Sequence, residues 1–185
     1  MSILVTGGAR SGKSGFAERL TRKLADSQQA VYVATGQAFD EEMEARITLH
    51  RQQRQADGFQ WETLEEPLKL AALLGRLSGS GQTVLVDCLT LWLSNQLLAV
   101  EERSDRKELV EAAIAELEQA VSGFEGTLIL VTNEVGGGIV PEYPLGRLYR
   151  DLAGRMNAQL AARCGPVFLV TAGIPVELRS REYLL

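Results

Sequence analysis

A glycine-rich segment near the start of the chain has the residue types and spacing of a phosphate-binding loop. Residues 7–14 read GGARSGKS and match the pattern G-x-x-x-x-G-K-[ST]. An apolar run at 3–6 precedes the segment and helical spacing follows it, so the motif joins a strand to a helix, which is the context that gives it meaning. The residues predicted to cradle the phosphates of a nucleotide are Gly7, Gly8, Ala9, Arg10, Ser11, Gly12, Lys13 and Ser14.

Each residue type in such a loop has its own role in binding the nucleotide. Glycines let backbone N–H groups face the phosphates, and the start of a helix adds positive potential. Lys13 reaches the terminal phosphates, and the Ser14 hydroxyl can ligate Mg²⁺. Asp87 ends the apolar run 83–87, where P-loop proteins place an acid beside that ion, although a carboxylate there can also simply cap a helix. We therefore expect a Mg²⁺–nucleotide site with Ser14 and Asp87 as metal ligands.

The one histidine of the chain lies in a basic stretch. Arg46, His50 and Arg54 are spaced four residues apart, so they share one face if this segment is helical. Neighbouring positive charge disfavours the imidazolium form, which would leave His50 neutral and nucleophilic near pH 7. The alternative is a solvated helix face whose histidine has no chemical role, and spacing alone favours that alternative.

A glycine-rich loop at 133–141 follows another predicted strand. It contains three successive glycines at 136–138, which indicate either a close approach of the backbone to a ligand or a plain flexible connection. The loop is not of the form N-K-x-D, so the guanine-reading motif of signalling GTPases is missing from it.

The elements that must position these residues alternate along the chain. Short apolar runs predict strands at 3–6, 30–35, 83–87, 127–132 and 167–171. Stretches with helical spacing lie at about 13–26, 40–56, 67–77, 89–98, 105–121 and 144–163. This order predicts an α/β fold with a mainly parallel sheet, helices on both faces, and a site at the carboxyl ends of the strands. The length and the absence of an evident linker predict one domain over 1–185.

Composition excludes several classes of protein. Lys and Arg number 19 against 24 Asp and Glu, a net charge of -5, so the chain lacks the basic footprint of nucleic-acid binders. Its two cysteines, Cys88 and Cys164, form no CxxC pattern, so neither a disulfide framework nor a zinc site is indicated. We see no signal peptide and no apolar stretch long enough to span a membrane. A cytoplasmic protein without a nucleic-acid or membrane partner is therefore expected.

Four segments together give the chain a specific resemblance. They are the loop GGARSGKS, the segment Arg46-Ile47-x-x-His50-Arg51, the loop 133–141, and Arg150-Asp151-x-x-Gly154-x-x-Asn157. In this order they resemble the bifunctional adenosylcobinamide kinase / adenosylcobinamide-phosphate guanylyltransferase family of cobalamin biosynthesis, nearly end to end.

The resemblance implies a transferase with two reactions on a RecA-like P-loop fold. An NTP, ATP or GTP, phosphorylates the aminopropanol hydroxyl of the corrinoid adenosylcobinamide. GTP then donates GMP to that phosphate through a GMP-histidine intermediate, which yields adenosylcobinamide-GDP and pyrophosphate. Members of the family assemble as homotrimers, so the same assembly is expected for this chain.

The resemblance also assigns residues. The covalent histidine of the family maps onto His50. Its nucleotide contacts map onto the phosphate loop and onto Thr35, Gly36, Gln37, Arg51, Gln52, Gln53, Arg54, Glu65 and Asp87. Two other interpretations remain open: a P-loop kinase for another metabolite, in which His50 carries no nucleotide, and a nucleotide-binding regulatory module.

Overall fold

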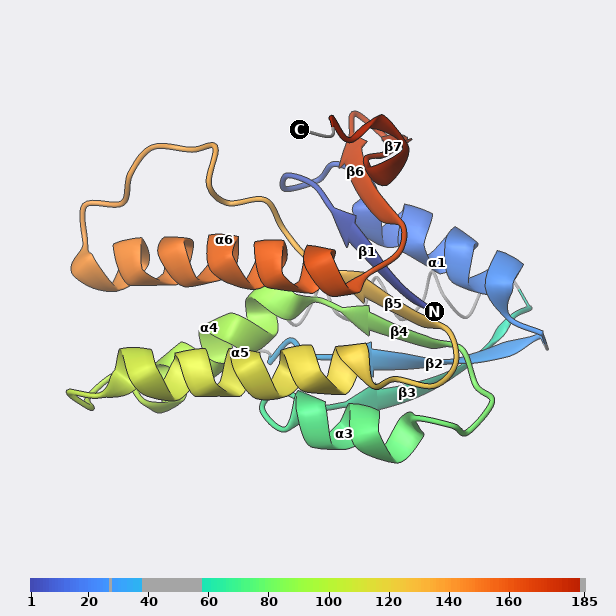
Figure 1. Cartoon of the computed structure of the whole chain (residues 1–185), viewed down its shortest axis with the longest axis horizontal. Coiled ribbons are helices and arrows are strands. Elements are labelled where there is room, and N and C mark those ends of the chain that lie inside the picture. The colour runs from blue at the N-terminus through green and yellow to red at the C-terminus, as the bar shows by residue number, and fades with distance from the viewer. Residues whose placement is uncertain (27, 38–57, 184–185) are drawn as a thin grey trace.

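The computed structural model describes residues 1–26, 28–37 and 58–183. Within these ranges, seven strands form one sheet in the order β3-β2-β4-β5-β1-β6-β7 (Figure 1). The strands are β1 (Ser2–Thr6), β2 (Gln29–Ala34), β3 (Gln60–Glu65), β4 (Val84–Asp87), β5 (Leu128–Val131), β6 (Val167–Thr171) and β7 (Ile174–Glu177). Neighbouring strands run parallel except for β6 and β7, so the prediction of a mainly parallel sheet is confirmed.

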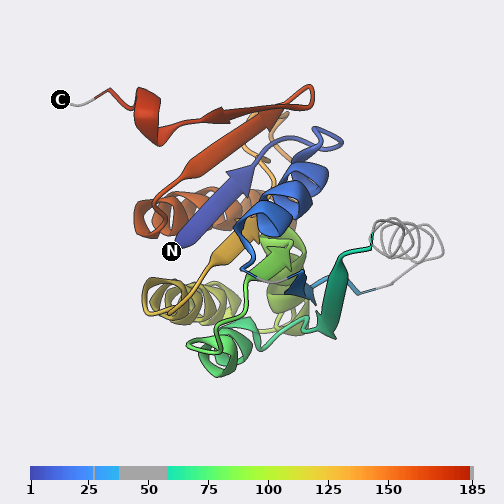
Figure 2. The same cartoon turned by 90° about the vertical axis from the view of Figure 1, so that its right-hand side faces the viewer.

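Helices cover both faces of the sheet, as the alternation predicts. They are α1 (Lys13–Leu24), α3 (Leu70–Leu77), α4 (Leu89–Ala99), α5 (Arg106–Ser122) and α6 (Pro144–Arg163), followed by the short 3-10 helix η1 (Arg179–Arg181). Figure 2 shows α1 on one face, with α3, α5 and α6 on the other. The helix predicted at 40–56 lies wholly within 38–57, outside the described residues. In the part of the chain that is described, no helix has both the length and the apolar content needed to cross a bilayer.

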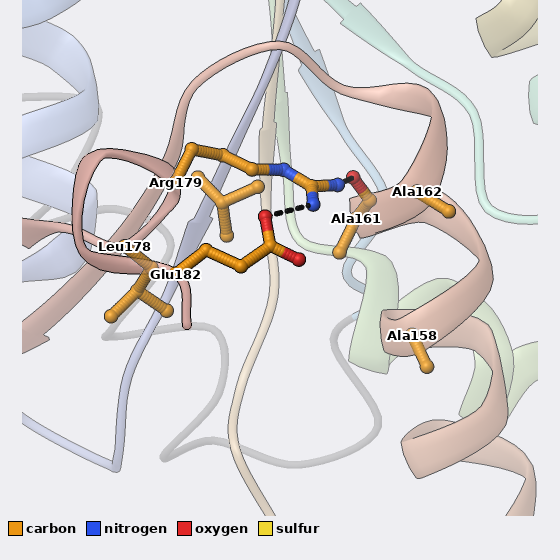
Figure 3. Close-up of a pocket in the computed structure, with 7 residues that line it drawn as sticks. Ala158, Ala161, Ala162, Leu178, Arg179 and Glu182 are labelled. Carbon is orange, nitrogen blue, oxygen red and sulfur yellow. Dashed lines mark hydrogen bonds and ion pairs between the residues drawn. The ribbon is translucent and has the colours of Figure 1, made fainter. Parts of the chain in front are cut away.

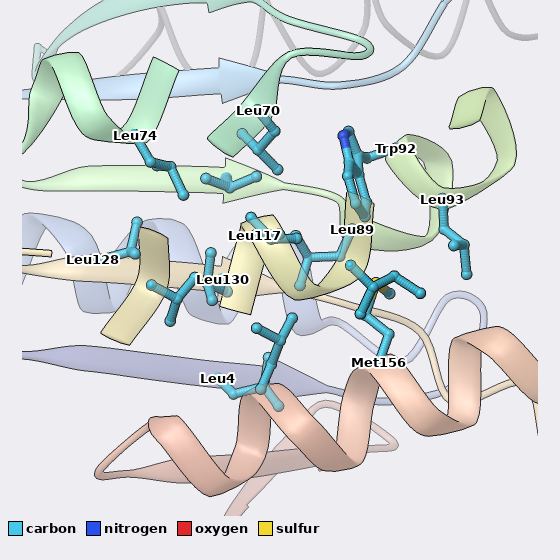
Figure 4. Packing of buried hydrophobic residues seen from close by; sticks show 14 of the residues in the cluster. Leu4, Leu70, Leu74, Leu89, Trp92, Leu93, Leu117, Leu128, Leu130 and Met156 are labelled. Atoms are coloured by element: carbon cyan, nitrogen blue, oxygen red, sulfur yellow. The ribbon is translucent and has the colours of Figure 1, made fainter. Parts of the chain in front are cut away.

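The core consists of two clusters of buried side chains, one on each face of the sheet. Successive residues of a strand point to opposite faces, so Leu4 joins the larger cluster while Ile3 and Val5 join the smaller one beside α1. In Figure 4, Trp92 of α4 and Met156 of α6 point into the larger cluster. Burial on both faces explains why the central strands read as continuous apolar runs.

Two strands, β3 and β7, were not predicted from the sequence because they lie at the edges of the sheet. Only Trp61 and Leu64 of β3 are even half-buried, so its sequence QWETLE contains no apolar run. Strand β7 contains Pro175 and returns antiparallel to β6 through a tight turn at 172–173. Proline in a strand is typical of edge positions and weakens a prediction based on apolar runs.

Candidate functional site

The loops that follow β1, β2, β4 and β5 meet at the edge where these parallel strands end, here called the carboxyl edge. The amide of Thr35, after β2, donates to the carbonyl of Asp87 at the end of β4, with 3.4 Å between N and O. The amide of Glu134, after β5, donates to the carbonyl of Gly7 at 3.1 Å. The structure therefore joins the predicted phosphate loop, the Thr35 loop, Asp87 and the glycine-rich loop in one place.

The backbone of the phosphate loop depends on two of its glycines. Gly12 has φ 92° and immediately precedes α1, in the left-handed region that L side chains rarely adopt. At Gly7, an added Cβ would lie 2.4 Å from the carbonyl oxygen of Val170. The loop could not keep this path with larger residues at these two positions, which is why the motif requires glycine there.

Lys13 lies beneath the loop. Its side chain is buried, and its Nζ donates to the carbonyl oxygen of Gly8 at 3.1 Å. The Lys13 ammonium also acts on the thiol of Cys88. Burial chiefly raises the pKa of that thiol, the carboxylate of Asp87 raises it further, and the ammonium of Lys13 lowers it. Both charges therefore act on the same point at the carboxyl edge, as expected for a phosphate-binding lysine and a metal-directed acid.

Ser14 and Asp87 provide oxygen atoms suited to a hard cation. The Asp87 side chain is half-buried and its Oδ2 accepts a hydrogen bond from the Tyr32 hydroxyl at 3.3 Å. The Ser14 hydroxyl, in the first turn of α1, has no hydrogen-bond partner among the described residues. Mg²⁺ typically takes one or two protein oxygens and completes its shell with water and substrate phosphates, so these two residues fit that ion.

A buried threonine fixes the loop after β2 to the start of α4. The Thr35 hydroxyl donates to the Cys88 carbonyl at 2.6 Å and accepts from the Cys88 amide at 2.9 Å. Asn95 of α4 donates to the Thr35 carbonyl at 2.8 Å. The Thr35 side chain thus bonds within the protein, while the exposed Gln37 lies further along the same loop.

A second polar network, which the sequence analysis missed, holds the loop after β5. The Nδ2 of Asn133 donates to Thr90 Oγ1 at 2.5 Å, and the Nδ2 of Asn157 donates to the Asn133 carbonyl at 3.0 Å. Thr132 Oγ1 donates to Asn157 Oδ1 at 2.7 Å, and the Tyr149 hydroxyl donates to the Thr90 carbonyl at 3.1 Å. Burial raises the pKa of Tyr149 to about 12, so it remains a neutral donor. Asn133 and Asn157 belong to two of the segments that carry the family resemblance, but nothing in the sequence indicated that they bond to each other.

The remaining predicted site residues divide into two groups. Glu65 ends β3 in register with Ala34 of β2 and is exposed at the same edge as the phosphate loop. The residues of the predicted histidine segment lie outside the described part of the chain: Arg46, His50, Arg51, Gln52, Gln53 and Arg54. The nucleotide contacts and the covalent role of His50 stay predictions.

A groove of about 410 Å³ elsewhere on the molecule does not belong to this site. It lies between the last turns of α6 and the segment around η1, where alanines of α6 face Leu178 (Figure 3). Arg179 crosses it, pairing with Glu182 at 2.9 Å and donating to the Ala161 carbonyl at 2.6 Å. Its lining contains no residue of the predicted nucleotide site.

Comparison with known proteins finds similar sequences along almost the whole chain. Residues 3–178 match the model of the family described as cobinamide kinase / cobinamide phosphate guanyltransferase. The bifunctional adenosylcobalamin biosynthesis protein CobP of Pseudomonas aeruginosa is 46% identical over 181 residues, which cover 97% of this chain and 98% of that protein. The bifunctional adenosylcobalamin biosynthesis proteins CobU of Escherichia coli and Salmonella typhimurium are 42% and 40% identical, each over 97% of this chain and 100% of the relative. The resemblance stated from the motifs is confirmed, and the chain belongs to the cobinamide kinase / cobinamide phosphate guanyltransferase family.

Proposed function

We propose that this protein phosphorylates adenosylcobinamide with an NTP and then transfers GMP from GTP to adenosylcobinamide phosphate, releasing pyrophosphate. The observation that carries the proposal is the match to bifunctional relatives over nearly the whole chain. The geometry supports it, because the phosphate loop with Lys13 and the acid Asp87 lie together at the carboxyl edge.

In the kinase reaction, the substrate hydroxyl attacks the γ-phosphorus of the NTP and the β–γ bond breaks. The hydroxyl proton passes to solvent water, and the nucleoside diphosphate departs with the bonding electrons. The loop amides and Lys13 hold the β and γ phosphates in place and offset their growing negative charge. Ser14 and Asp87 would hold Mg²⁺, which supplies further positive charge to the phosphates.

In the guanylyl transfer, the same loop would hold the leaving group instead. A ring nitrogen of His50 attacks the α-phosphorus of GTP, the α–β bond breaks, and pyrophosphate departs from the phosphate loop. A phosphate oxygen of adenosylcobinamide phosphate then attacks the phosphorus bound to His50. The P–N bond breaks, the imidazole regains its electron pair, and adenosylcobinamide-GDP forms. The arginines near His50 in sequence, Arg51 and Arg54, are suited to bind phosphate oxygens bidentately.

The covalent step separates this proposal from a single-function kinase and from a regulatory module. Incubated with α-labelled GTP and Mg²⁺, the wild type should retain label after denaturation, and the bond should be acid-labile and base-stable as expected of a phosphoramidate. The His50→Asn variant should not label and should lose guanylyl transfer by several orders of magnitude, yet keep kinase activity. Equal labelling of both proteins would contradict the role of His50, and a wild type that phosphorylates adenosylcobinamide but never labels would indicate a plain kinase.

The resemblance extends the proposal to assembly and location. We propose that the protein acts in the cytoplasm as a homotrimer. Sedimentation equilibrium of the whole chain would test the assembly directly, since a monomeric mass across the micromolar range would contradict it.

A further inference from the structure

An open pocket of about 730 Å³ lies between the loop after β5 and the first half of α6. Figure 1 shows this loop arching away from β5 and returning to the start of α6. The volume is in the usual range for small-molecule sites. The pocket shares no lining residue with the predicted nucleotide site. It is lined by Gly136, Val140, Arg147, Arg150, Asp151, Gly154 and Arg155.

The pocket has an excess of positive charge. Three arginines line it against one carboxylate, Asp151, and the charge of Arg155 is also balanced by Glu111, whose Oε1 lies 2.8 Å from its Nη1. Within residues 1–26, 28–37 and 58–183, neither Arg147 nor Arg150 forms an ion pair. A net positive charge therefore remains at the part of the pocket where these two arginines lie.

Both arginines donate hydrogen bonds to backbone carbonyls of the glycine-rich loop or of Glu142, the residue that follows it. Arg147 Nη1 donates to the carbonyl of Glu142 at 2.6 Å and to that of Pro141 at 3.2 Å, and Arg150 donates to the carbonyl of Gly136. A guanidinium has five N–H donors, so each arginine keeps several donors for a ligand while its position is set by the loop. Guanidinium forks match the geometry of a phosphate group better than a lysine does.

The pocket adjoins the phosphate loop. Gly136, which lines the pocket and accepts from Arg150, is two residues beyond Glu134, whose amide donates to Gly7 at 3.1 Å. Two residues of extended chain span at most about 7 Å. The Gly136 wall of the pocket therefore lies close to the start of the phosphate loop.

We infer that Arg147 and Arg150 form the acceptor subsite, which binds the phosphate monoester of adenosylcobinamide phosphate during guanylyl transfer. The inference rests on the proposed function. The site has a charged part and an apolar part, as this acceptor requires. Its two guanidinium groups can bind the phosphate dianion. The exposed Val140 and its neighbour Ile139 offer an apolar surface to the corrinoid at the rim. The other source of a phosphate group is the nucleotide itself, and the test separates the two.

The test first compares two glutamine variants and one control variant in both reactions. In Arg147→Gln and Arg150→Gln, the KM for adenosylcobinamide phosphate should rise about 10- to 100-fold, which corresponds to the loss of one charge-assisted hydrogen bond. The KM for GTP, the labelling of the protein by α-labelled GTP, and the KM for unphosphorylated adenosylcobinamide in the kinase reaction should stay within about twofold. The matched control is Arg163→Gln, which removes an arginine of the same helix paired with Glu118, outside the pocket. It should leave all four quantities unchanged.

Other outcomes would overturn the inference. An equal rise in the KM for GTP, or a loss of labelling, would assign the arginines to the nucleotide phosphates. Unchanged constants, or equal losses with both corrinoids accompanied by a lower thermal midpoint, would mean that the arginines only hold the loop. Arg150→Lys separates these roles further, because it keeps the charge but loses the fork, and should give a KM between those of wild type and Arg150→Gln. Failure of the wild type to transfer GMP at all would reject the proposed function as well.

Discussion

The Thr35→Val substitution removes a hydroxyl that joins two loops of the carboxyl edge. In the native protein, this fully buried hydroxyl donates to the Cys88 carbonyl at 2.6 Å and accepts from the Cys88 amide at 2.9 Å. Valine has a methyl group in place of the hydroxyl and can make neither bond. Because Cys88 directly follows Asp87, the substitution acts on the segment that positions the predicted metal ligand.

The two lost bonds have different costs. The Cys88 amide loses its partner in a buried place, which costs about 1–3 kcal/mol. The Cys88 carbonyl keeps the hydrogen bond from the Trp92 amide at 3.2 Å. Losing its bond from the Thr35 hydroxyl should therefore cost only the net value of one hydrogen bond, about 0.5–1.5 kcal/mol. Burying the additional methyl offsets up to about 0.8 kcal/mol. We expect the free energy of unfolding to fall by about 1–4 kcal/mol, and the thermal midpoint to fall by about 5–10 °C at the middle of that range.

Urea unfolding followed by far-ultraviolet circular dichroism measures this loss, and Thr21→Val is the matched control. Thr21 is equally buried, but its hydroxyl donates to the Ala17 carbonyl within α1, so replacing it leaves no buried amide without a partner. The control should lose less than about 1 kcal/mol. Equal losses in the two variants would refute the reasoning, because the orphaned Cys88 amide is the feature that distinguishes them.

Three further substitutions test the site and the fold. Lys13→Ala should lower both activities by at least about 100-fold, since both reactions use the same phosphate loop, and near-normal guanylyl transfer would exclude a shared site. Asp87→Asn should lower Mg²⁺-dependent turnover by about 10- to 100-fold at an unchanged thermal midpoint, because an amide oxygen can still accept from Tyr32. Glu177 accepts from the amides of Ser180, Val167 and Arg179, which lower its pKa to about 2. A carboxyl whose pKa is lowered on folding stabilises the fold at pH values above its pKa in the unfolded chain, about 4.3 for glutamate. The urea midpoint of the wild type should therefore exceed that of Glu177→Gln by its full amount at pH 6, and the difference should vanish as the pH falls to about 2. A difference that stays constant with pH would contradict this.

The central part of the fold could be predicted because its strands are buried on both faces. The apolar runs at 3–6 and 83–87 correspond to β1 (Ser2–Thr6) and β4 (Val84–Asp87) within one residue at each end. Strand β3 gave no such run, because an edge strand is held by backbone hydrogen bonds on one side and needs few apolar side chains. The same reason applies to β7, whose pairing with β6 depends on a tight turn rather than on hydrophobic pattern.

The site was predictable only where local geometry requires particular residues. The glycines of the phosphate loop are constrained by their own backbone and by close neighbours, so the motif can be recognised from their spacing in the sequence alone. The hydrogen bonds among Thr90, Asn133 and Asn157 join three elements distant in sequence, and each residue alone resembles an ordinary helix or loop residue. Arg147 and Arg150 have the spacing of a solvated helix face. Arg150 also belongs to a segment that carries the family resemblance, but only the return of the loop over α6 makes the two arginines line a pocket.

The short segment 134–136 stands between the phosphate loop and the proposed acceptor subsite. The Glu134 amide donates to Gly7, its Oε1 accepts from the Gly136 amide at 2.6 Å, and the Gly136 carbonyl accepts from Arg150. Group transfer needs donor and acceptor held in one geometry, and a segment bonded at both ends supplies such a fixed separation. At Gly136 an added Cβ would lie 2.8 Å from Glu134 Oε1, the end of a flexible side chain that would have to move, whereas nothing lies within 4 Å of a Cβ at Gly137 or Gly138. Of the three successive glycines, only the first therefore has a close neighbour within the segment that connects the phosphate loop to the proposed acceptor subsite.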